Sequence, residues 1–340
     1  MSTSTPEGSQ SKARSTAGAK GANYHRQCTG AALRTVEAHS TPQPLTLYGA
    51  AFCPFVHRVW IALEVLGVPY RYIEVDPYEK PKSLLEVNPK GLVPSLRIEG
   101  KDGESRGLGE STVILEYLHE RFVDSSQSSS NGKSLLPSLS SASSSSSSEQ
   151  AVYQRAQHRL VSHHLNAKLI PAFYRFLQAQ EPEKQVQFGG EFVDEIRWFQ
   201  ERLEEADKVS KAEGGGGGGD FFGGAKEIGW TDVMLAPWAF RATNVLHHFR
   251  SLSLSSPTLF PPNSRYDRWT QAVFSHPAFL ATTSTEDLYL DSYARYAENR
   301  PNTSQVAKAI NEGREFGTGD GDGDDEERGE GKRRVGVEQC

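Results

Sequence analysis

The chain is poor in the features that mark secreted, membrane-bound or nucleic-acid-binding proteins. Its 340 residues include only three cysteines, which are too few and too widely spaced for a disulfide framework. No apolar stretch reaches the roughly 18 residues of a membrane-spanning helix, and no secretory signal precedes the foldable region. The formal net charge is −6, so the basic excess typical of nucleic-acid binding is missing. We therefore expect a cytoplasmic protein without nucleic-acid partners or stable membrane insertion.

Four stretches have compositions that do not support a core. We expect a disordered N-terminal extension (1–44), a Ser-rich linker (125–148), a flexible Gly-rich insert (about 212–225) and a disordered charged tail (313–340). The extension carries five Lys and Arg residues against only two glutamates, so a mitochondrial presequence is the alternative to a plain disordered segment. Within the linker, Leu135 and Leu136 are apolar enough to dock onto the folded body. The remaining sequence is long enough for two modest domains.

Residues 45–124 alternate between strand and helix patterns. A strand at 45–48 precedes an amphipathic helix that ends at Gly67, and a β-branched and aromatic strand follows at 70–75. A short strand, a Gly-containing hairpin loop and a helix complete the segment. This order, β-α-β followed by β-β-α, predicts a thioredoxin-like domain.

Residues 149–312 show helical spacing and lack strand signals, which predicts an all-helical second domain. Asp232 occupies a position suited to capping the start of a helix. Its expected Ser or Thr partner three residues earlier is Gly229, so the capping box is predicted to be incomplete.

One cysteine lies at the predicted junction between the first strand and the first helix. Backbone N–H groups at a helix N-terminus stabilise an anion, and thiols in such sites have pKa values of roughly 3.5 to 7.5. Cys53 is therefore a nucleophile candidate, whereas Cys28 and Cys340 lie in polar tails. A dithiol enzyme would carry a second cysteine at position 56, but Val56 occupies it. An external thiol must then resolve any mixed disulfide formed by Cys53.

Four motifs mark the region around this cysteine and the helical domain. They are CPFVHR at 53–58, NPKGLVPSL at 88–96, Glu110-Ser111, and WTDVMLAPW at 230–238. In this arrangement the chain, over about residues 45–310, resembles the cytosolic glutathione transferases, specifically the omega-like class that uses cysteine in its fungal-type form. The resemblance implies glutathione as co-substrate, no metal, and Phe55 packing beside the bound tripeptide.

The same resemblance assigns further contacts to glutathione. Val93-Pro94 matches the cis-proline turn that pairs with the cysteinyl backbone. Glu110 and Ser111 match the pair that holds the γ-glutamyl carboxylate, with Ser111 capping a helix. Lys80 matches the lysine that pairs with the glycyl carboxylate.

Four residues of the helical domain have side chains suited to a substrate pocket. They are aromatic or basic, and packing in the core is the alternative for each: Tyr153, Tyr174, Trp238 and Arg241. His57 and Arg58 are interpreted as structural, because a thiolate stabilised by a helix end needs no general base.

The resemblance implies thiol transfer and deglutathionylation through Cys53, with dehydroascorbate reduction as a related activity. The expected partners are glutathione and small electrophilic or glutathionylated substrates, and family members commonly form homodimers. The alternative is a non-catalytic binding or membrane-switching protein resembling the chloride intracellular channels, which share the Cys-Pro-Phe start.

Overall fold

The N-terminal domain is built around a mixed four-stranded sheet. The computed structural model describes residues 24–77, 79–124, 133–139, 145–212, 218–301 and 303–312. The strands are β1 (Leu45–Gly49), β2 (Arg71–Glu74), β3 (Ser95–Glu99) and β4 (Ser105–Gly109), in the order β2-β1-β3-β4. Strand β1 is parallel to β2 and antiparallel to β3, and β3 pairs with β4 antiparallel. This arrangement confirms the predicted thioredoxin-like domain.

Three helices complete this domain: α2 (Pro54–Leu66), α3 (Lys82–Val87) and α4 (Ser111–His119), the last followed by the π-helical turn η1 (Glu120–Asp124). Helix α2 is buried along almost its whole length because α8 and α4 pack against it. Pro54 at its first position and Gly67 in the left-handed region (φ 64°) at its end set its limits. The first helix after Cys53 is therefore a core element.

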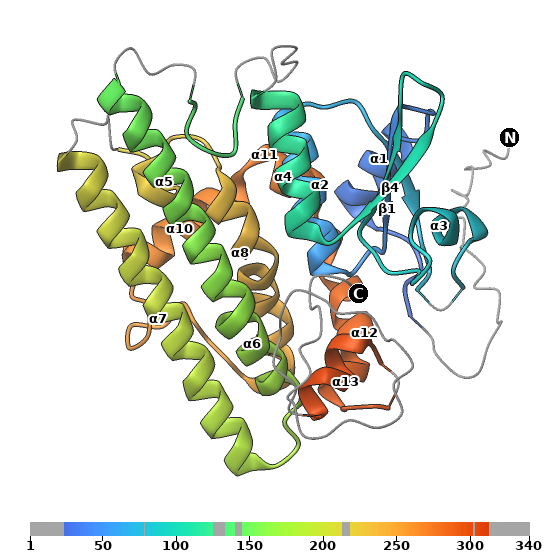
Figure 1. Cartoon of the computed structure of the whole chain (residues 1–340). Coiled ribbons are helices and arrows are strands. Elements are labelled where there is room, and N and C mark those ends of the chain that lie inside the picture. Colours follow the sequence, from blue (N-terminus) through green and yellow to red (C-terminus); the bar gives the residue numbers. More distant parts are fainter. Residues whose placement is uncertain are drawn as a thin grey trace, which may run out of the picture.

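The described secondary-structure elements of the second domain are all helices, as predicted. Figure 1 shows α5, α6 and α7 on its outer side and α8 behind them. The elements are α5 (Ser145–His164), η2 (Leu165–Leu169), α6 (Ile170–Gln178), α7 (Pro182–Ala212), η3 (Phe222–Gly224), α8 (Trp230–Arg241), η4 (Ala242–Leu246), α9 (His247–Arg250), α10 (Arg265–Ser275), α11 (Pro277–Ala281), α12 (Glu286–Ala297) and α13 (Gln305–Asn311).

The buried carboxylate of Asp232 organises the start of α8. Its Oδ2 accepts from the Gly229 N–H at 2.8 Å, which is half of a capping box, and glycine has no side chain to supply the other half. Its Oδ1 accepts from the Phe222 N–H and from the Trp269 indole N–H. Burial raises the pKa of Asp232 to about 6 in spite of these donors.

The prediction that residues 1–44 are disordered is wrong for 24–44. Helix α1 (Gly30–Ala38) packs against α11 and β2, and the side chains of Cys28 and Ala32 are buried. The backbone N–H of Cys28 donates to Glu74, and the N–H of Ala32 donates to the Thr283 carbonyl. The segment is fixed largely by hydrogen bonds to both domains, which its polar composition did not reveal. Residues 1–23 lie outside the described residues.

The other segments expected to lack a core also contain folded parts. Leu135 and Leu136 are buried, and the Leu135 carbonyl accepts from Trp230 N–H, which confirms the predicted docking of this pair. Helix α5 begins at Ser145, inside the predicted linker. Phe221 and Phe222, within the predicted Gly-rich insert, are buried because they pack at the start of α8. Residues 125–132, 140–144, 213–217 and 313–340 lie outside the described residues.

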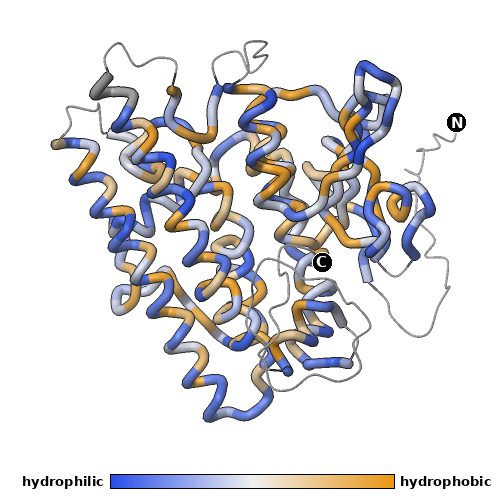
Figure 2. Tube along the Cα trace, viewed as in Figure 1, coloured by the Kyte–Doolittle hydropathy of each residue, from blue (hydrophilic) through white to orange (hydrophobic). Residues whose placement is uncertain are grey.

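One apolar core extends across both domains. Figure 2 shows apolar residues along the inward sides of the helices, with hydrophilic residues prominent along α7. Members of the cluster come from β1, α2, α6, α8 and α12. Among the helices that the structure describes, none has both the length and the apolar character required to cross a bilayer.

Buried histidines are expected to make the fold sensitive to acid. Burial lowers the pKa of four histidines below that of an exposed imidazole, to about 4 for two of them: His57, His119, His158 and His276. The unfolded chain therefore binds more protons than the native one between about pH 4 and 6.5, so stability falls as the pH falls through this range. Asp232 and Glu74, whose pKa values are raised by burial, act in the opposite direction but are fewer.

We expect the free energy of unfolding to be lower at about pH 5 than at about pH 7.5, by on the order of 3 kcal/mol. Urea denaturation at the two pH values measures the difference. His158→Gln should reduce the pH dependence, whereas replacing exposed His248 should not change it. Equal stability at both pH values would contradict this prediction.

Candidate active site

Cys53 occupies the N-cap position of α2, as its sequence context predicts. Its backbone is extended (φ −70°, ψ 121°), and its carbonyl accepts the first turn's N–H from His57 at 3.1 Å. The Cys53 Sγ lies 3.9 Å from the carbonyl oxygen of Val93. Its side chain is buried, with 1% of its surface exposed. The structure therefore brings the cysteine together with the turn at Val93-Pro94.

The tight approach of β1 to α2 requires glycine before the cysteine loop. A Cβ atom at Gly49 would lie 2.4 Å from Tyr72 Oη and 2.6 Å from Val56 Cγ1, closer than real Cβ contacts come. The absence of a side chain at Gly49 lets the strand end against the helix, and this contact sets where the loop to Cys53 begins.

The turn opposite Cys53 is held by side-chain hydrogen bonds. The Val93-Pro94 peptide bond is cis, as predicted. Ser95 Oγ donates to the Leu92 carbonyl at 2.7 Å, and Asn88 Nδ2 donates to Ser95 Oγ at 3.1 Å. These bonds fix the loop that carries Val93 next to the sulfur.

Glu110 and Ser111 lie at the start of α4. Glu110, not Ser111, is the N-cap residue, and neither side chain caps the helix; the predicted capping role of Ser111 is wrong because Ser111 is already the first helical residue. Glu110 has φ 65°, a left-handed conformation that costs a non-glycine residue roughly 1 to 3 kcal/mol and is enriched at functional sites. Ser111 is fully buried, and its Oγ accepts from Arg58 Nη1 at 3.4 Å.

A cavity of about 490 Å³ lies between the two domains beside this site. Its N-domain wall includes Phe52 and Leu92, the residues adjacent to Cys53 and Val93, and the exposed Lys80. The opposite wall comes from α12, α13 and the segment between them, and includes Arg300 and Lys308. No sequence motif surrounds these two cations, so the sequence alone did not indicate them.

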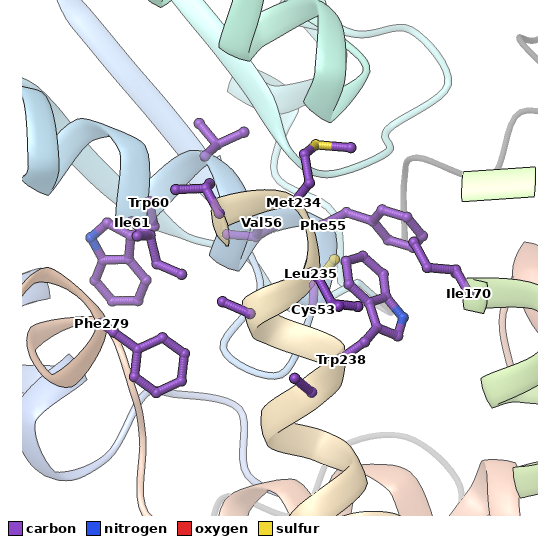
Figure 3. Packing of buried hydrophobic residues seen from close by; sticks show 14 of the residues in the cluster. Cys53, Phe55, Val56, Trp60, Ile61, Ile170, Met234, Leu235, Trp238 and Phe279 are labelled. Carbon is purple, nitrogen blue, oxygen red and sulfur yellow. The ribbon is translucent and has the colours of Figure 1, made fainter. Parts of the chain in front are cut away.

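Phe55 and Trp238 belong to the interdomain core and not to the cavity wall. Their rings meet edge to face at 4.8 Å, and the Arg58 guanidinium lies 4.3 Å from the Trp238 ring centroid. Figure 3 shows these two rings beside Cys53 and Leu235. The Phe55 ring packs against Trp238 of α8, and its place beside the bound tripeptide stays a prediction. Its backbone still belongs to the first turn of α2.

The four predicted pocket residues do not line the cavity beside Cys53. Tyr174 and Arg241 are fully buried, as is Trp238. Tyr153 is 56% exposed on α5 and lines a second cavity, of about 570 Å³, with residues of α7 and η3. The buried aromatic side chains of these helices pack between the helices. The wall of the cavity beside Cys53 comes instead from the region after α12.

His57 and Arg58 pack in the core, which supports their structural interpretation. His57 Nε2 lies 3.0 Å from Thr282 Oγ1, and burial, with a smaller effect of Arg241, lowers its pKa well below that of an exposed imidazole. Arg58 donates to the Met234 carbonyl at 2.9 Å and to Asn166 Oδ1 at 2.8 Å. Both side chains connect α2 to the helical domain.

Cys28 is in a setting that keeps it protonated. It is buried beside Glu74, and this burial, reinforced by the glutamate, raises the pKa of the Cys28 thiol far above its usual value. The sequence placed Cys28 in a polar tail, but its side chain is packed, and this packing makes the thiol less reactive. Cys340 lies outside the described residues.

Comparisons with known proteins agree with this architecture. The family model described as "Glutathione S-transferase, N-terminal domain" matches residues 47–126, and the one described as "Glutathione S-transferase, C-terminal domain" matches 152–272. The crystal structure of glutathione transferase Omega 3C from Trametes versicolor superposes with a TM-score of 0.61 at 30% identity, covering 80% of this chain and 98% of that one.

Two curated relatives extend the comparison. Glutathione S-transferase omega-1 from Sus scrofa is 25% identical over 255 residues, 73% of this chain and 87% of the relative. Pyrimidodiazepine synthase from Drosophila melanogaster is 44% identical over 78 residues, and the chain spans only 32% of its length. The two family models together cover more than half of the chain, which therefore belongs to the cytosolic glutathione transferases. Within that family, the chain belongs to the omega-like class.

Proposed function

We propose that this protein is a glutathione-dependent thiol transferase that removes glutathione from glutathionylated substrates. The observation that carries the proposal is the position of Cys53, at the N-terminus of a buried helix and against the cis turn at Val93. Partial positive charge at the helix start favours a thiolate. Tyr or Ser, which conjugating transferases use to activate glutathione, is absent from this position.

The proposed reaction proceeds in two exchanges. The Cys53 thiolate attacks the glutathione sulfur of a mixed disulfide, forming a Cys53–glutathione disulfide while the substrate thiolate leaves and takes up a proton. A second glutathione, as its thiolate, attacks this disulfide, releases oxidised glutathione and restores the Cys53 thiolate. With an α-thioketone conjugate the same attack would release the carbon group as an enolate, which is then protonated. Dehydroascorbate reduction is a related activity that the family resemblance implies.

Glutathione is proposed to bind with its cysteinyl backbone at Val93 and its γ-glutamyl carboxylate at Glu110 and Ser111. Lys80 would pair with the glycyl carboxylate at the mouth of the cavity. On the opposite wall Arg300 and Lys308 form ion pairs with Glu298 and Glu312, so this wall adds little net positive charge and Lys80 is the cation proposed to meet the ligand. The exposed Lys80 Nζ lies 3.4 Å from the Lys90 carbonyl, close enough to the wall to reorient toward a ligand.

Lys80→Ala and Ser111→Ala are each expected to weaken glutathione binding by about 1 to 3 kcal/mol, since each removes a hydrogen bond to a charged group. Calorimetric titration of reduced protein measures the change. Lys82→Ala is the matched control, because this exposed lysine does not line the cavity, and its affinity should equal that of the unmodified protein. Unchanged affinity in both Lys80→Ala and Ser111→Ala would show that glutathione binds elsewhere.

The alternative of a membrane-switching protein receives no support from α2. A switch into the bilayer would have to detach this helix, which is buried against α8 and held by the Arg58 hydrogen bonds to Met234 and Asn166. Partitioning into liposomes at acidic pH together with loss of thiol transfer would favour the alternative.

A further inference from the structure

A guanidinium group is buried directly behind the cysteine loop. Arg241, the last residue of α8, is fully buried. Its Nη2 donates to the Phe52 carbonyl at 2.8 Å, and its Nη1 donates to the Pro237 carbonyl at 2.8 Å. Among the described residues, no carboxylate forms an ion pair with it, and its Nε has no hydrogen-bond partner. A buried charge without a counter-ion is costly, so its retention needs a reason.

The peptide unit held by Arg241 is the one that leads into Cys53. The Phe52 carbonyl accepts from Arg241, and the N–H of the same peptide, that of Cys53, donates to the Ala50 carbonyl at 3.0 Å. Both polar groups of this peptide are therefore fixed. Bond lengths from the Phe52 oxygen to the Cys53 sulfur, added to the 2.8 Å contact, place Nη2 within about 10 Å of the sulfur.

The surroundings of the guanidinium are aromatic. Its carbon lies 4.7 Å from the Tyr289 ring centroid and 5.7 Å from that of Tyr293, both on α12. Tyr293 also meets the Phe52 ring edge to face at 6.3 Å. Aromatic faces stabilise a cation without neutralising it. The charge of Arg241 therefore stays available to a second group nearby.

The tyrosines and the histidine that face Arg241 remain uncharged near neutral pH. Burial raises the pKa values of three tyrosines on α6 and α12, and Arg241 opposes this shift in each without reversing it: Tyr174, Tyr289 and Tyr293. On α2, burial keeps His57 neutral, and Arg58 adds a second buried cation one turn after Cys53. Beyond the cysteine, Glu110 stands before α4, and Lys80 lines the cavity.

We propose that Arg241 is a positioning residue that fixes the Phe52-Cys53 peptide and favours the thiolate form of Cys53 through its buried charge. This inference deepens the proposed function and rests on it. Two roles follow from one side chain, and they are separable. The two hydrogen bonds depend on guanidinium geometry, whereas the effect on the thiolate depends on charge alone. Substitutions that remove one property and keep the other can therefore test the proposal.

The test measures the pH dependence of Cys53 alkylation by iodoacetamide in fully reduced protein, followed by mass spectrometry of the Cys53 peptide. Arg241→Gln removes the charge and keeps donor groups; it should raise the alkylation pKa by about one unit, the effect of a unit charge about 10 Å away. Its thiol-transfer rate should fall about tenfold near pH 6.5 and recover at higher pH, with glutathione affinity within about twofold.

Arg241→Lys keeps the charge and loses the two-pronged geometry. Its alkylation pKa should stay near that of the unmodified protein, while its thiol-transfer rate falls about threefold at every pH. Arg197→Gln, an exposed arginine on α7, is the control for loss of one positive charge and should change neither quantity. An unshifted alkylation pKa in Arg241→Gln would overturn the proposal. An increase of one full unit in the alkylation pKa of Arg241→Lys would also overturn the proposal. This second test remains valid when Arg241→Gln does not fold.

The alkylation titration requires no turnover, so its outcome is independent of the proposed function. A shifted alkylation pKa in Arg241→Gln, with no thiol transfer by the unmodified protein, would support the role of Arg241 and reject the proposed function. Normal thiol transfer by the unmodified protein, with no difference in the alkylation pKa of Cys53 among the variants, would support the proposed function and reject the role of Arg241.

Discussion

Replacing Cys53 with serine is expected to abolish glutathione-dependent thiol transfer and deglutathionylation while leaving glutathione binding within about twofold. Serine cannot form a mixed disulfide, and its hydroxyl does not ionise near neutral pH. The contacts proposed for the tripeptide come from Lys80, Val93, Glu110 and Ser111, which the substitution leaves intact. Activity with a glutathionylated peptide and calorimetric titration of glutathione together measure the two halves of this expectation.

Weak conjugating activity in Cys53→Ser would agree with this mechanism, because glutathione then carries the reactive sulfur. The matched control is Cys28→Ser, which alters a buried thiol whose pKa is raised by burial. Its thiol-transfer activity should equal that of the unmodified protein. Retention of full deglutathionylating activity in Cys53→Ser would reject the proposed nucleophile.

Removing residues 1–44 is expected to lower the free energy of unfolding by at least about 3 kcal/mol. The loss would expose the surfaces beneath Cys28 and Ala32, both buried. It would also uncover the outer edge of β2, an edge strand of the sheet, where the Tyr72 N–H donates to the His39 carbonyl at 2.8 Å. An uncovered edge invites aggregation, so solubility should fall as well.

A chain that lacks only residues 1–22 is the control for this deletion. It keeps every described contact of the segment, including Tyr24 Oη with Asp76 at 2.9 Å and Thr35 Oγ1 with the Ala281 carbonyl at 2.6 Å. Its urea midpoint should match that of the full chain. Equal midpoints for all three chains would mean that the packing of residues 24–44 contributes nothing measurable to stability.

The sequence predicted those parts of the fold that depend on local pattern. The strand at Leu45 and the helix that ends at Gly67 each have a short-range signal, and together they placed Cys53 at the start of a helix. The cis turn at Val93-Pro94 was predicted from the family resemblance. The long helical segments of the second domain were also visible from apolar spacing. These features determine the class of fold and the identity of the nucleophile candidate.

The sequence did not reveal the features that depend on contacts between distant segments. Residues 24–44 are polar and lack strong periodicity, yet they bind both domains through hydrogen bonds such as Cys28 N–H to Glu74. Aromatic residues suited to a pocket, such as Trp238, became core because α8 packs against α2. Arg241 was predicted as a pocket residue because it is basic, and nothing local indicates that it donates to the Phe52 carbonyl.

The location of the enzyme-bound glutathione tests the central claim most directly. Fully reduced protein is exposed to a glutathionylated peptide without free glutathione, and the adduct is mapped by mass spectrometry of a digest under non-reducing conditions. We predict that Cys53 gains the glutathionyl group, that the peptide thiol is released in equal amount, and that added glutathione removes the adduct. A glutathionyl adduct on Cys28 or Cys340, or peptide release with no adduct on Cys53, would contradict the mechanism.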